Sequence, residues 1–330
     1  RKRYVSMKEF DFSKTNQLKV TVLAGGVGGA KLTVGLDRIL PPGNLTVIVN
    51  TGDDFTHFGL RICPDLDTVC YSLAGLANKT YGWGLESETW NVADALEALG
   101  APTWFQLGDR DLALHMERTR LLTQGKKLSE VTADMCRRWG ISSKVLPMSD
   151  DESPTLIETQ SGEVIAFQDY LVKHRAEPEV KSILLHGFKE PNPLNSVIDA
   201  IYESDLVVIA PSNPWVSIDP ILELEGIREA LKSRTVVAVS PIIQGKAIKG
   251  PAAKMFSELG IEPSSLAVMK HYQDILDLFV YDLTDEPISK SEIPDGLKTF
   301  QLQTIMSNEE DKIQLARQIL DVLVGPAEEA

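Results

Sequence analysis

The sequence has few cysteines, no long apolar run and fewer basic than acidic residues. Its 330 residues include three cysteines, an odd number without a CxxC pair: Cys63, Cys70 and Cys136. This pattern argues against a disulfide framework and against a zinc site. No apolar stretch approaches the length of a membrane span, and residues 1–17 lack the apolar centre of a signal peptide. We therefore expect a cytoplasmic protein without a membrane partner.

The shortage of basic residues limits the kind of ligand that the protein can attract. Lys and Arg number 33 against 47 Asp and Glu, which gives a formal net charge of −14 at pH 7. Nucleic acids are attracted by clustered Lys and Arg, so we predict no nucleic-acid partner. A small anionic ligand would need a metal ion or backbone N–H groups to bind here. The composition, 43% hydrophobic and 24% charged, is typical of a globular protein.

Apolar runs with little alternation recur along the chain, and helical patterns lie between them. Such runs are typical of strands buried on both faces of a parallel sheet, and here they cover residues 19–24, 45–50, 205–210 and 235–240. Helices are predicted over residues 30–40, 91–99, 112–122 and 129–139. We predict an α/β fold with a Rossmann-like, doubly wound and mostly parallel sheet.

The middle of the chain departs from this pattern. Two alternating runs on either side of Ser161 and Gly162 predict a β-hairpin, and the sheet pattern resumes at about Lys181. We therefore expect a single α/β domain over residues 18–330, with residues 101–180 as an inserted helical and hairpin subdomain. Residues 1–17 are interpreted as a disordered tail or a remnant of cloning.

The segment VTVLAGGVGGAKL, residues 20–32, joins a strand to a helix through four glycines. Glycine lets a backbone approach an anion closely, and the start of the helix offers unpaired N–H groups. The segment matches neither standard phosphate loop, because Lys31 stands where the Rossmann pattern has glycine and the Gly-Lys-Ser/Thr order of the P-loop is missing. A phosphate cradle and a tight structural turn both remain possible from these residues.

Four carboxylates follow within fifteen residues. Asp53 and Asp54 come at a strand end, while Asp65 and Asp67 fall in the first turn of a helix that Pro64 would begin. An aspartate in a first turn often only caps its helix. Four carboxylates beside a glycine loop favour a Mg²⁺ and diphosphate site, since Mg²⁺ prefers oxygen ligands. We predict that Asp54 and Asp67 hold Mg²⁺ and that all four form the catalytic set, one of them as a base.

Other strand ends carry polar residues as well. The carboxyl ends of parallel strands meet at one edge, so residues that follow different strands can share one crevice. Ser212 and Asn213 follow one strand, and Lys246 lies after another. Arg110, at the start of a helix, could reach a phosphate.

Nine motifs in this order resemble one known family. They are GGVGGAKL, NTGDD, CPDLDTV, GWG with ETW, LGDRDLALH, LPMSDD, FQDY, APSNP and SPIIQGKAIKGPAAK, and they cover roughly residues 20–254. The sequence is similar to the 2-phospho-L-lactate transferase family of coenzyme F420 biosynthesis, and to its bacterial more than its archaeal branch. The resemblance implies transfer of a phospholactyl, phosphoenolpyruvyl or related three-carbon group from a guanosine-diphosphate-linked donor to the deazaflavin Fo. GMP would leave, F420-0 or its dehydro form would be the product, and the enzyme would be a homodimer.

The motifs and the resemblance together give a set of predicted site residues. For the donor and its GDP moiety they are Gly25, Gly26, Gly28, Gly29, Lys31, Arg110, Ser212, Asn213 and Lys246. For the acceptor Fo they are Asp67, Trp83, Trp90, Gln106 and His115. Two other functions stay open at this point: a non-catalytic nucleotide-sugar-binding regulator and an NAD(P)-dependent oxidoreductase. Neither would need four clustered carboxylates.

Overall fold

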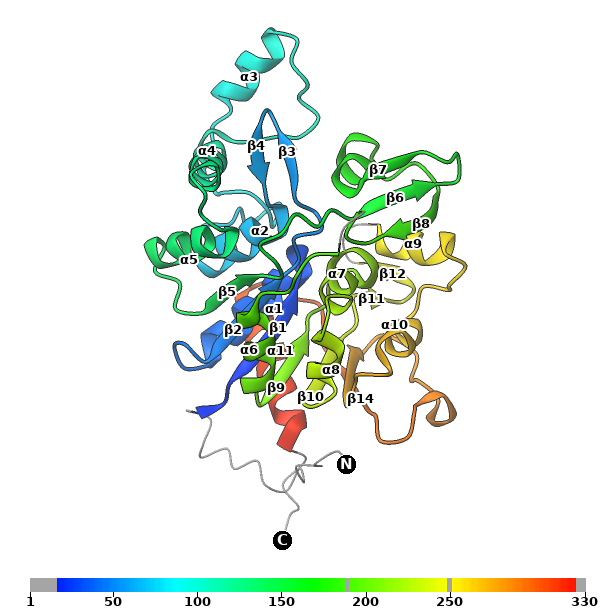
Figure 1. Cartoon of the computed structure of the whole chain (residues 1–330). Coiled ribbons are helices and arrows are strands. Elements are labelled where there is room, and N and C mark those ends of the chain that lie inside the picture. The colour runs from blue at the N-terminus through cyan, green and yellow to red at the C-terminus, as the bar shows by residue number, and fades with distance from the viewer. Residues whose placement is uncertain (1–16, 188–189, 248–250, 325–330) are drawn as a thin grey trace.

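A computed structural model describes residues 17–187, 190–247 and 251–324 of the chain. Its centre is a seven-stranded sheet of order β14-β13-β10-β9-β1-β2-β5, in which all neighbouring strands run parallel (Figure 1). The strands are β1 (Val20–Ala24), β2 (Leu45–Val49), β5 (Lys144–Pro147), β9 (Leu206–Ile209), β10 (Thr235–Val239), β13 (Leu278–Asp282) and β14 (Lys298–Leu302). The predicted α/β class and the four predicted strands are confirmed. Of the predicted tail, all but Gln17 lies outside the described residues.

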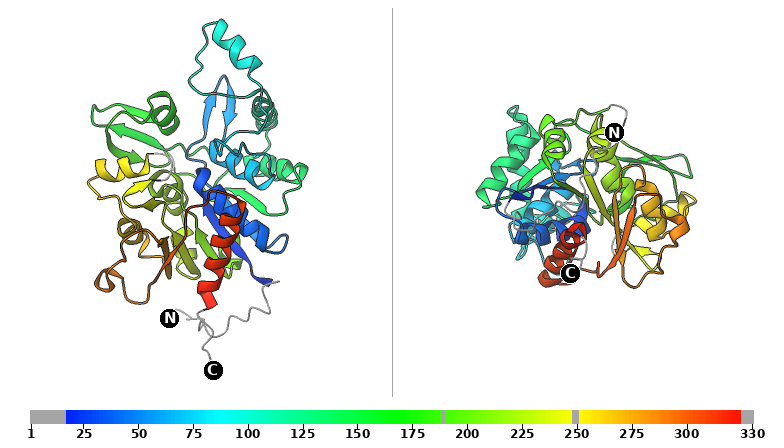
Figure 2. Two further views of the ribbon diagram at one scale, coloured as in Figure 1. Left: turned by 180° about the vertical axis from the view of Figure 1, so that it is seen from behind. Right: turned by 90° about the horizontal axis from the view of Figure 1, so that it is seen from below.

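Helices cover both faces of this sheet, as the apolar strands require. Alternate residues of one strand face opposite layers: Val22 of β1 packs with one buried cluster and Leu23 with the other. The first layer holds α1 (Gly26–Ile39), α2 (Pro64–Leu73), α5 (Leu128–Arg138) and α11 (Glu309–Val324). The second holds α6 (Asn195–Glu203), α7 (Asp219–Leu222), α8 (Ile227–Leu231) and α10 (Ser265–Tyr272). Figure 2 shows α11 lying along α1 when the molecule is seen from behind.

Two groups of smaller elements rise from one end of the sheet, on opposite sides (Figure 1). One holds the hairpin β3 (Phe55–His57) and β4 (Leu60–Ile62) with α3 (Asn91–Ala98) and α4 (Asp109–Thr123). The other holds β6 (Leu156–Thr159), β7 (Val164–Ala166), β8 (Val180–Leu184), the π-helical turn η3 (Asp169–Lys173) and α9 (Ala252–Glu258). The remaining short elements are η4 (Pro214–Ile218), β11 (Ile242–Ile243), β12 (Lys246–Ala247) and η5 (Lys290–Glu292).

The predicted hairpin is confirmed, because β6 and β7 pair antiparallel across Ser161 and Gly162. The expectation that the main sheet resumes at about Lys181 is wrong. That residue lies in β8, which pairs antiparallel with β6 in a separate three-stranded sheet. Apolar content alone does not reveal which strand a segment pairs with. Within the predicted insertion 101–180, β5 belongs to the central sheet, and the proposed subdomain boundaries stay a prediction.

The strand order places a crevice beside β1. The chain runs from β1 outward through β2 to β5, then returns to β9 on the other side of β1 and continues through β10 to β14. Ligands of doubly wound folds bind outside the carboxyl ends of the strands where the order reverses in this way. The glycine loop after β1 and the residues after β9 therefore meet at that point. No helix within the described part of the chain has the length and apolarity needed to cross a membrane.

Candidate functional site

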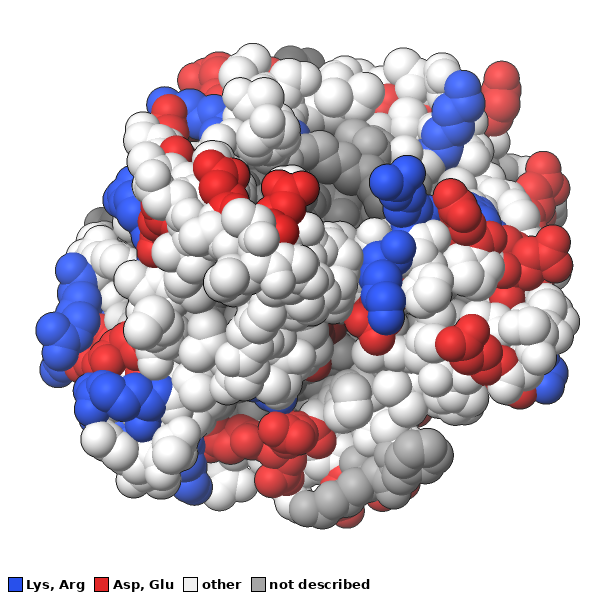
Figure 3. All heavy atoms as spheres, turned by 90° about the horizontal axis from the view of Figure 1, so that it is seen from above, with Lys and Arg blue, Asp and Glu red and all other residues white. Residues whose placement is uncertain are grey.

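A pocket of about 990 Å³ opens at this end of the sheet. It lies between the two groups of small elements, and Figure 3 shows basic and acidic side chains around a hollow in this face. Twelve of the predicted site residues line it: Gly25, Gly26, Gly28, Lys31, Asp53, Asp65, Asp67, Trp83, Gln106, His115, Ser212 and Asn213. The fold thus brings most of the sequence-predicted residues to one cavity.

Five predicted residues are not among those that line this pocket: Gly29, Asp54, Trp90, Arg110 and Lys246. The guanidinium of Arg110 donates to the Glu86 carbonyl oxygen at 2.7 Å, so it is held away from a bound phosphate. Lys246 is exposed on β12, and Lys249 of the same loop lies outside the described residues. The position of these two residues in the sequence did not reveal where their side chains lie.

The glycines of the loop after β1 are needed for packing within the site. A Cβ at Gly25 would lie 2.5 Å from an oxygen of Asp65, and one at Gly28 would lie 2.3 Å from the Pro211 carbonyl oxygen. The Gly26 N–H donates to Asp65 Oδ1 at 2.7 Å, and the Gly25 N–H donates to Ser212 Oγ at 3.2 Å. The loop is therefore locked to the first turn of α2 and to the segment after β9.

Asp53 and Asp65 are brought together by Asn50, the first residue after β2. The Asn50 amide nitrogen donates to Asp53 Oδ1 and to Asp65 Oδ2, both at 2.9 Å. Gln168 donates to the other oxygen of Asp53 at 3.2 Å. Burial raises the pKa of Asp65 to about 6, and burial together with the Asp65 charge raises the pKa of Asp53 well above its usual value. Two buried carboxylates that share a site in this way favour a bound cation.

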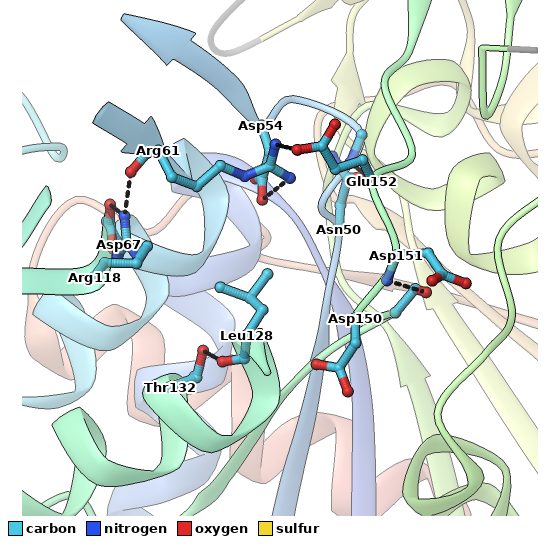
Figure 4. A network of polar contacts seen from close by, with 12 residues as sticks. Asn50, Asp54, Arg61, Asp67, Arg118, Leu128, Thr132, Asp150, Asp151 and Glu152 are labelled. Carbon is cyan, nitrogen blue, oxygen red and sulfur yellow. Dashed lines mark hydrogen bonds and ion pairs between the residues drawn. The ribbon is translucent and has the colours of Figure 1, made fainter. Parts of the chain in front are cut away.

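Asp54 and Asp67 are instead each paired with an arginine, the half-buried Arg61 and the buried Arg118 (Figure 4). Arg61 donates to Asp54 Oδ2 at 3.3 Å, and burial raises the pKa of Asp54 to about 7 in spite of this partner. Arg118 reaches both carboxylate oxygens of Asp67, one of them at 3.1 Å. Among the described residues, Asp54 and Asp67 therefore each belong to an ion pair, whereas Asp53 and Asp65 have no cationic partner.

His115 extends the Asp67 ion pair toward the pocket. Its Nδ1 lies 3.2 Å from an Arg118 nitrogen, and its Nε2 lies 3.3 Å from Asp111 Oδ2. Tyr71 donates its hydroxyl to the other oxygen of Asp111. Asp67, Asp111 and His115 offer three ligand atoms within 4.8 Å of one another. Because Arg118 already compensates Asp67, this group needs a cation less than Asp53 and Asp65 do.

An aromatic wall lines the pocket on the side of the β3–β4 hairpin. Trp104 and Phe105 both line the cavity, and their ring centroids lie 5.8 and 4.9 Å from that of Phe55. Trp83 lines the pocket as well, whereas Trp90 does not. The sequence analysis missed Trp104 and Phe105, although the run TWFQ directly precedes the LGDRD motif and was a usable signal.

Comparison with known proteins identifies the family. A model of the family described as 2-phospho-L-lactate transferase CofD matches residues 20–320. The chain belongs to this family. It is 41% identical over 312 residues to a phosphoenolpyruvate transferase of Streptomyces griseus, a match that covers 92% of this chain and 98% of the relative. It is 39% identical over 295 residues to a 2-phospho-L-lactate transferase of Methanosarcina mazei, covering 89% and 97%.

The CofD family membership confirms the predicted resemblance and makes the chain a transferase. A further relative, the phosphoenolpyruvate transferase of Thermobifida fusca, is 43% identical over 281 residues, which cover 81% of this chain and 87% of the relative. Among solved structures, a protein of Bacillus halodurans superposes with a TM-score of 0.61 at 19% identity, covering 92% of this chain and 99% of that one. The structural match supports the fold.

Proposed function

We propose that this CofD-family transferase moves a phosphoenolpyruvyl group from a guanosine-diphosphate-linked donor to the deazaflavin Fo. The ribityl hydroxyl of Fo attacks the phosphorus that carries the three-carbon acid, and its proton passes to one of the buried carboxylates. The bond from that phosphorus to the oxygen bridging to the guanosine phosphate breaks, so GMP leaves and the dehydro form of F420-0 is the product. The names of the Streptomyces and Thermobifida relatives support the phosphoenolpyruvyl group, and that of the Methanosarcina relative keeps 2-phospholactate as the second candidate.

The observation that carries this proposal is the composition of one pocket. Its floor combines the glycine loop with Ser212 and Asn213, which suit a diphosphate. Buried carboxylates lie beside this floor, and the aromatic wall stands opposite. A flat deazaflavin ring needs such a wall, and its polar tail would then point toward the carboxylates. A NAD(P)-dependent oxidoreductase or a non-catalytic regulator would leave the carboxylate group without a role, and the family match favours neither.

The residues present fit a Mg²⁺ ion, and Asp53 and Asp65 fit it better than the expected pair. Both line the pocket and both are buried, with raised pKa values that a cation would lower again. Asp54 does not line the pocket, and Asp67 is held by Arg118. Bound Mg²⁺ would offset charge on the diphosphate as GMP departs. We therefore propose Asp53 and Asp65 as the ligands, with Asp54 and Asp67 as ion-paired neighbours that shape the site.

Mg²⁺ should stabilise the protein more at about pH 8 than at about pH 5. Raised carboxylate pKa values mean that the folded protein binds protons more tightly than the unfolded chain, so metal-free stability falls as pH rises from about 4 through about 6. Mg²⁺ competes with those protons, and its stabilisation grows over the same range. At a concentration of 100 times Kd the gain is about 2.7 kcal/mol. Thermal unfolding with and without Mg²⁺ at each pH measures this stabilisation. A stabilisation that does not change with pH would contradict Asp53 and Asp65 as the ligands.

Replacing Trp83 by Ala should weaken Fo binding by about 1–3 kcal/mol, the range of a lost aromatic stack, and leave GDP affinity unchanged. Trp90→Ala is the matched control, because Trp90 belongs to the same segment but does not line the pocket. Fluorescence titration with both ligands measures the effect. Equal loss for Fo and GDP would indicate a folding defect, and an unchanged Fo affinity would place the ring against Trp104 and Phe105 alone.

Product analysis tests the function as a whole. Purified protein is incubated with Fo, Mg²⁺ and either the enolpyruvyl or the lactyl ester of GDP, and the products are analysed by mass spectrometry. The two products differ in mass by H₂, so the preferred acid is read directly, and GMP is quantified by chromatography. Absence of a new deazaflavin product with both donors would refute the proposed reaction. The predicted homodimer and cytoplasmic location stay predictions that sedimentation and fractionation can address.

A further inference from the structure

Two cations line the pocket at a place that the sequence analysis did not consider. Lys173 ends η3 and Arg175 follows it after one residue, and both side chains line the cavity. Both residues are exposed. Among the described residues, neither side chain has a hydrogen-bond or ion-pair partner. By contrast, Lys31, a third cation of the lining, donates to the Met306 carbonyl oxygen at 2.6 Å.

The backbone that carries these cations is fixed in an unusual conformation. Arg175 and Ala176 are consecutive non-glycine residues in the left-handed region, with φ of 52° and 54°. Such residues cost about 1–3 kcal/mol each and persist only where the surroundings hold them. Here the Ala176 N–H donates to the carbonyl oxygen of the buried Tyr170 at 2.8 Å, and Lys254 Nζ donates to the Pro178 carbonyl oxygen at 2.9 Å. These contacts hold the backbone that presents Arg175 at the pocket.

The segment that carries the two cations, residues 168–175, starts beside Asp53. Gln168, which directly precedes η3, donates to Asp53, so the first residue of this segment touches the proposed metal pair. Lys173 and Arg175 follow along the same cavity, past the apolar side chains of Leu171 and Val172. A group bound beside the Asp53 and Asp65 pair could therefore extend along apolar atoms toward two cations.

The charges of the pocket show which group needs these cations. This inference rests on the proposed function, in which the donor carries a diphosphate and a carboxylate. The diphosphate would lie over the glycine loop and the metal pair. The carboxylate of the three-carbon acid then enters a pocket that already contains Asp53, Asp65 and Asp111, and it needs a cation of its own. Arg118 donates to the carboxylate of Asp67, and Lys31 donates to the carbonyl oxygen of Met306. Among the described cations that line the pocket, Lys173 and Arg175 are left.

We propose that Arg175, assisted by Lys173, binds the carboxylate of the three-carbon acid and so selects donors that are acids. A guanidinium presents two parallel N–H groups that match a carboxylate, while an ammonium adds charge without that geometry. The apolar side chains of Leu171 and Val172 would contact the carbon atoms between phosphate and carboxylate. Both cations are specificity-determining residues that bind the donor at a distance from the reacting phosphorus.

Binding of two matched esters of GDP tests this assignment without turnover. The lactyl ester carries the carboxylate, and the isopropyl ester has an uncharged methyl group in its place. Isothermal titration in the presence of Mg²⁺ and the absence of Fo gives the affinity ratio of the two esters for each variant. Arg175→Asn removes the cation while asparagine tolerates the left-handed backbone. Arg175→Lys keeps the charge and removes the two parallel N–H groups of the guanidinium. Arg137→Gln on α5 is the control, because it removes an exposed arginine elsewhere.

We expect wild type and Arg137→Gln to prefer the lactyl ester, and Arg175→Asn to lose about tenfold to 100-fold of that preference with isopropyl-ester affinity unchanged. The preference of Arg175→Lys for the lactyl ester should lie between those of wild type and Arg175→Asn. An equal loss for both esters and for GDP would show that the pair binds the diphosphate, which overturns the assignment, as would an unchanged ratio in Arg175→Asn. If wild type binds neither ester and forms no product with Fo, the proposed function itself fails. If wild type transfers the group and the ratio is unchanged, only the assignment of the pair fails.

Discussion

Replacing Asp65 by Asn should lower turnover by about 100-fold or more and raise the Mg²⁺ concentration needed for half-maximal turnover. Asp65 accepts hydrogen bonds from Asn50 and from the Gly26 N–H, so it ties the proposed metal pair to the glycine loop. Loss of one of two carboxylate ligands removes charge stabilisation where GMP departs, and about 2.7 kcal/mol of transition-state energy corresponds to 100-fold in rate. Asparagine keeps the size and can still accept from Gly26, so the fold should persist.

The control for this prediction is Asp54→Asn. Asp54 is also buried and is one of the same four carboxylates, but it is paired with Arg61 and does not line the pocket. Steady-state kinetics over a range of Mg²⁺ concentrations should leave the half-saturating concentration of Asp54→Asn near that of wild type. If the half-saturating Mg²⁺ concentration rose strongly for Asp54→Asn and not for Asp65→Asn, the result would favour the pair predicted from the sequence, Asp54 and Asp67.

Replacing Arg118 by Met should destabilise the protein by about 3–5 kcal/mol, because it leaves a buried carboxylate without its partner. Arg118 is 4% exposed and Asp67 is 7% exposed, so water cannot take the place of the lost guanidinium. Burial already raises the pKa of Asp67, and Arg118 offsets part of that rise. Urea denaturation of the two proteins at neutral pH gives the difference in the free energy of unfolding.

The double variant Arg118→Met, Asp67→Asn separates the ion pair from simple packing. Removal of the stranded charge should recover most of the lost stability, since a neutral amide costs less to bury than an unpaired carboxylate. Arg120→Met is the matched control on the same helix, because Arg120 is exposed and its pair with Glu117 should contribute about 0.2–1 kcal/mol. A double variant as unstable as Arg118→Met alone would show that Arg118 stabilises α4 by packing and not by charge.

The sequence by itself determined the layered fold and most of the polar lining of the pocket. Short runs rich in β-branched residues, such as residues 45–50, favour strands buried on both faces, and in a parallel sheet their carboxyl ends share one edge. Residues that directly follow β1 and β9 therefore had to meet, which is why the glycine loop and Ser212 were found. Pro64 likewise fixed the start of α2 and so placed Asp65 and Asp67 in its first turn.

Only the tertiary structure decided which polar groups are partners. Asp53 and Asp54 are neighbours in sequence, yet their side chains have different partners, Asn50 and Arg61, because the chain turns here, with the Asp54 N–H donating to the Thr51 carbonyl oxygen. Arg118 lies 51 residues from Asp67, and no local pattern signals that contact. Arg175 reaches the pocket through a left-handed backbone that packing holds in place and that composition cannot predict. Local patterns follow from short-range backbone preferences, whereas these pairings depend on how distant elements pack against each other.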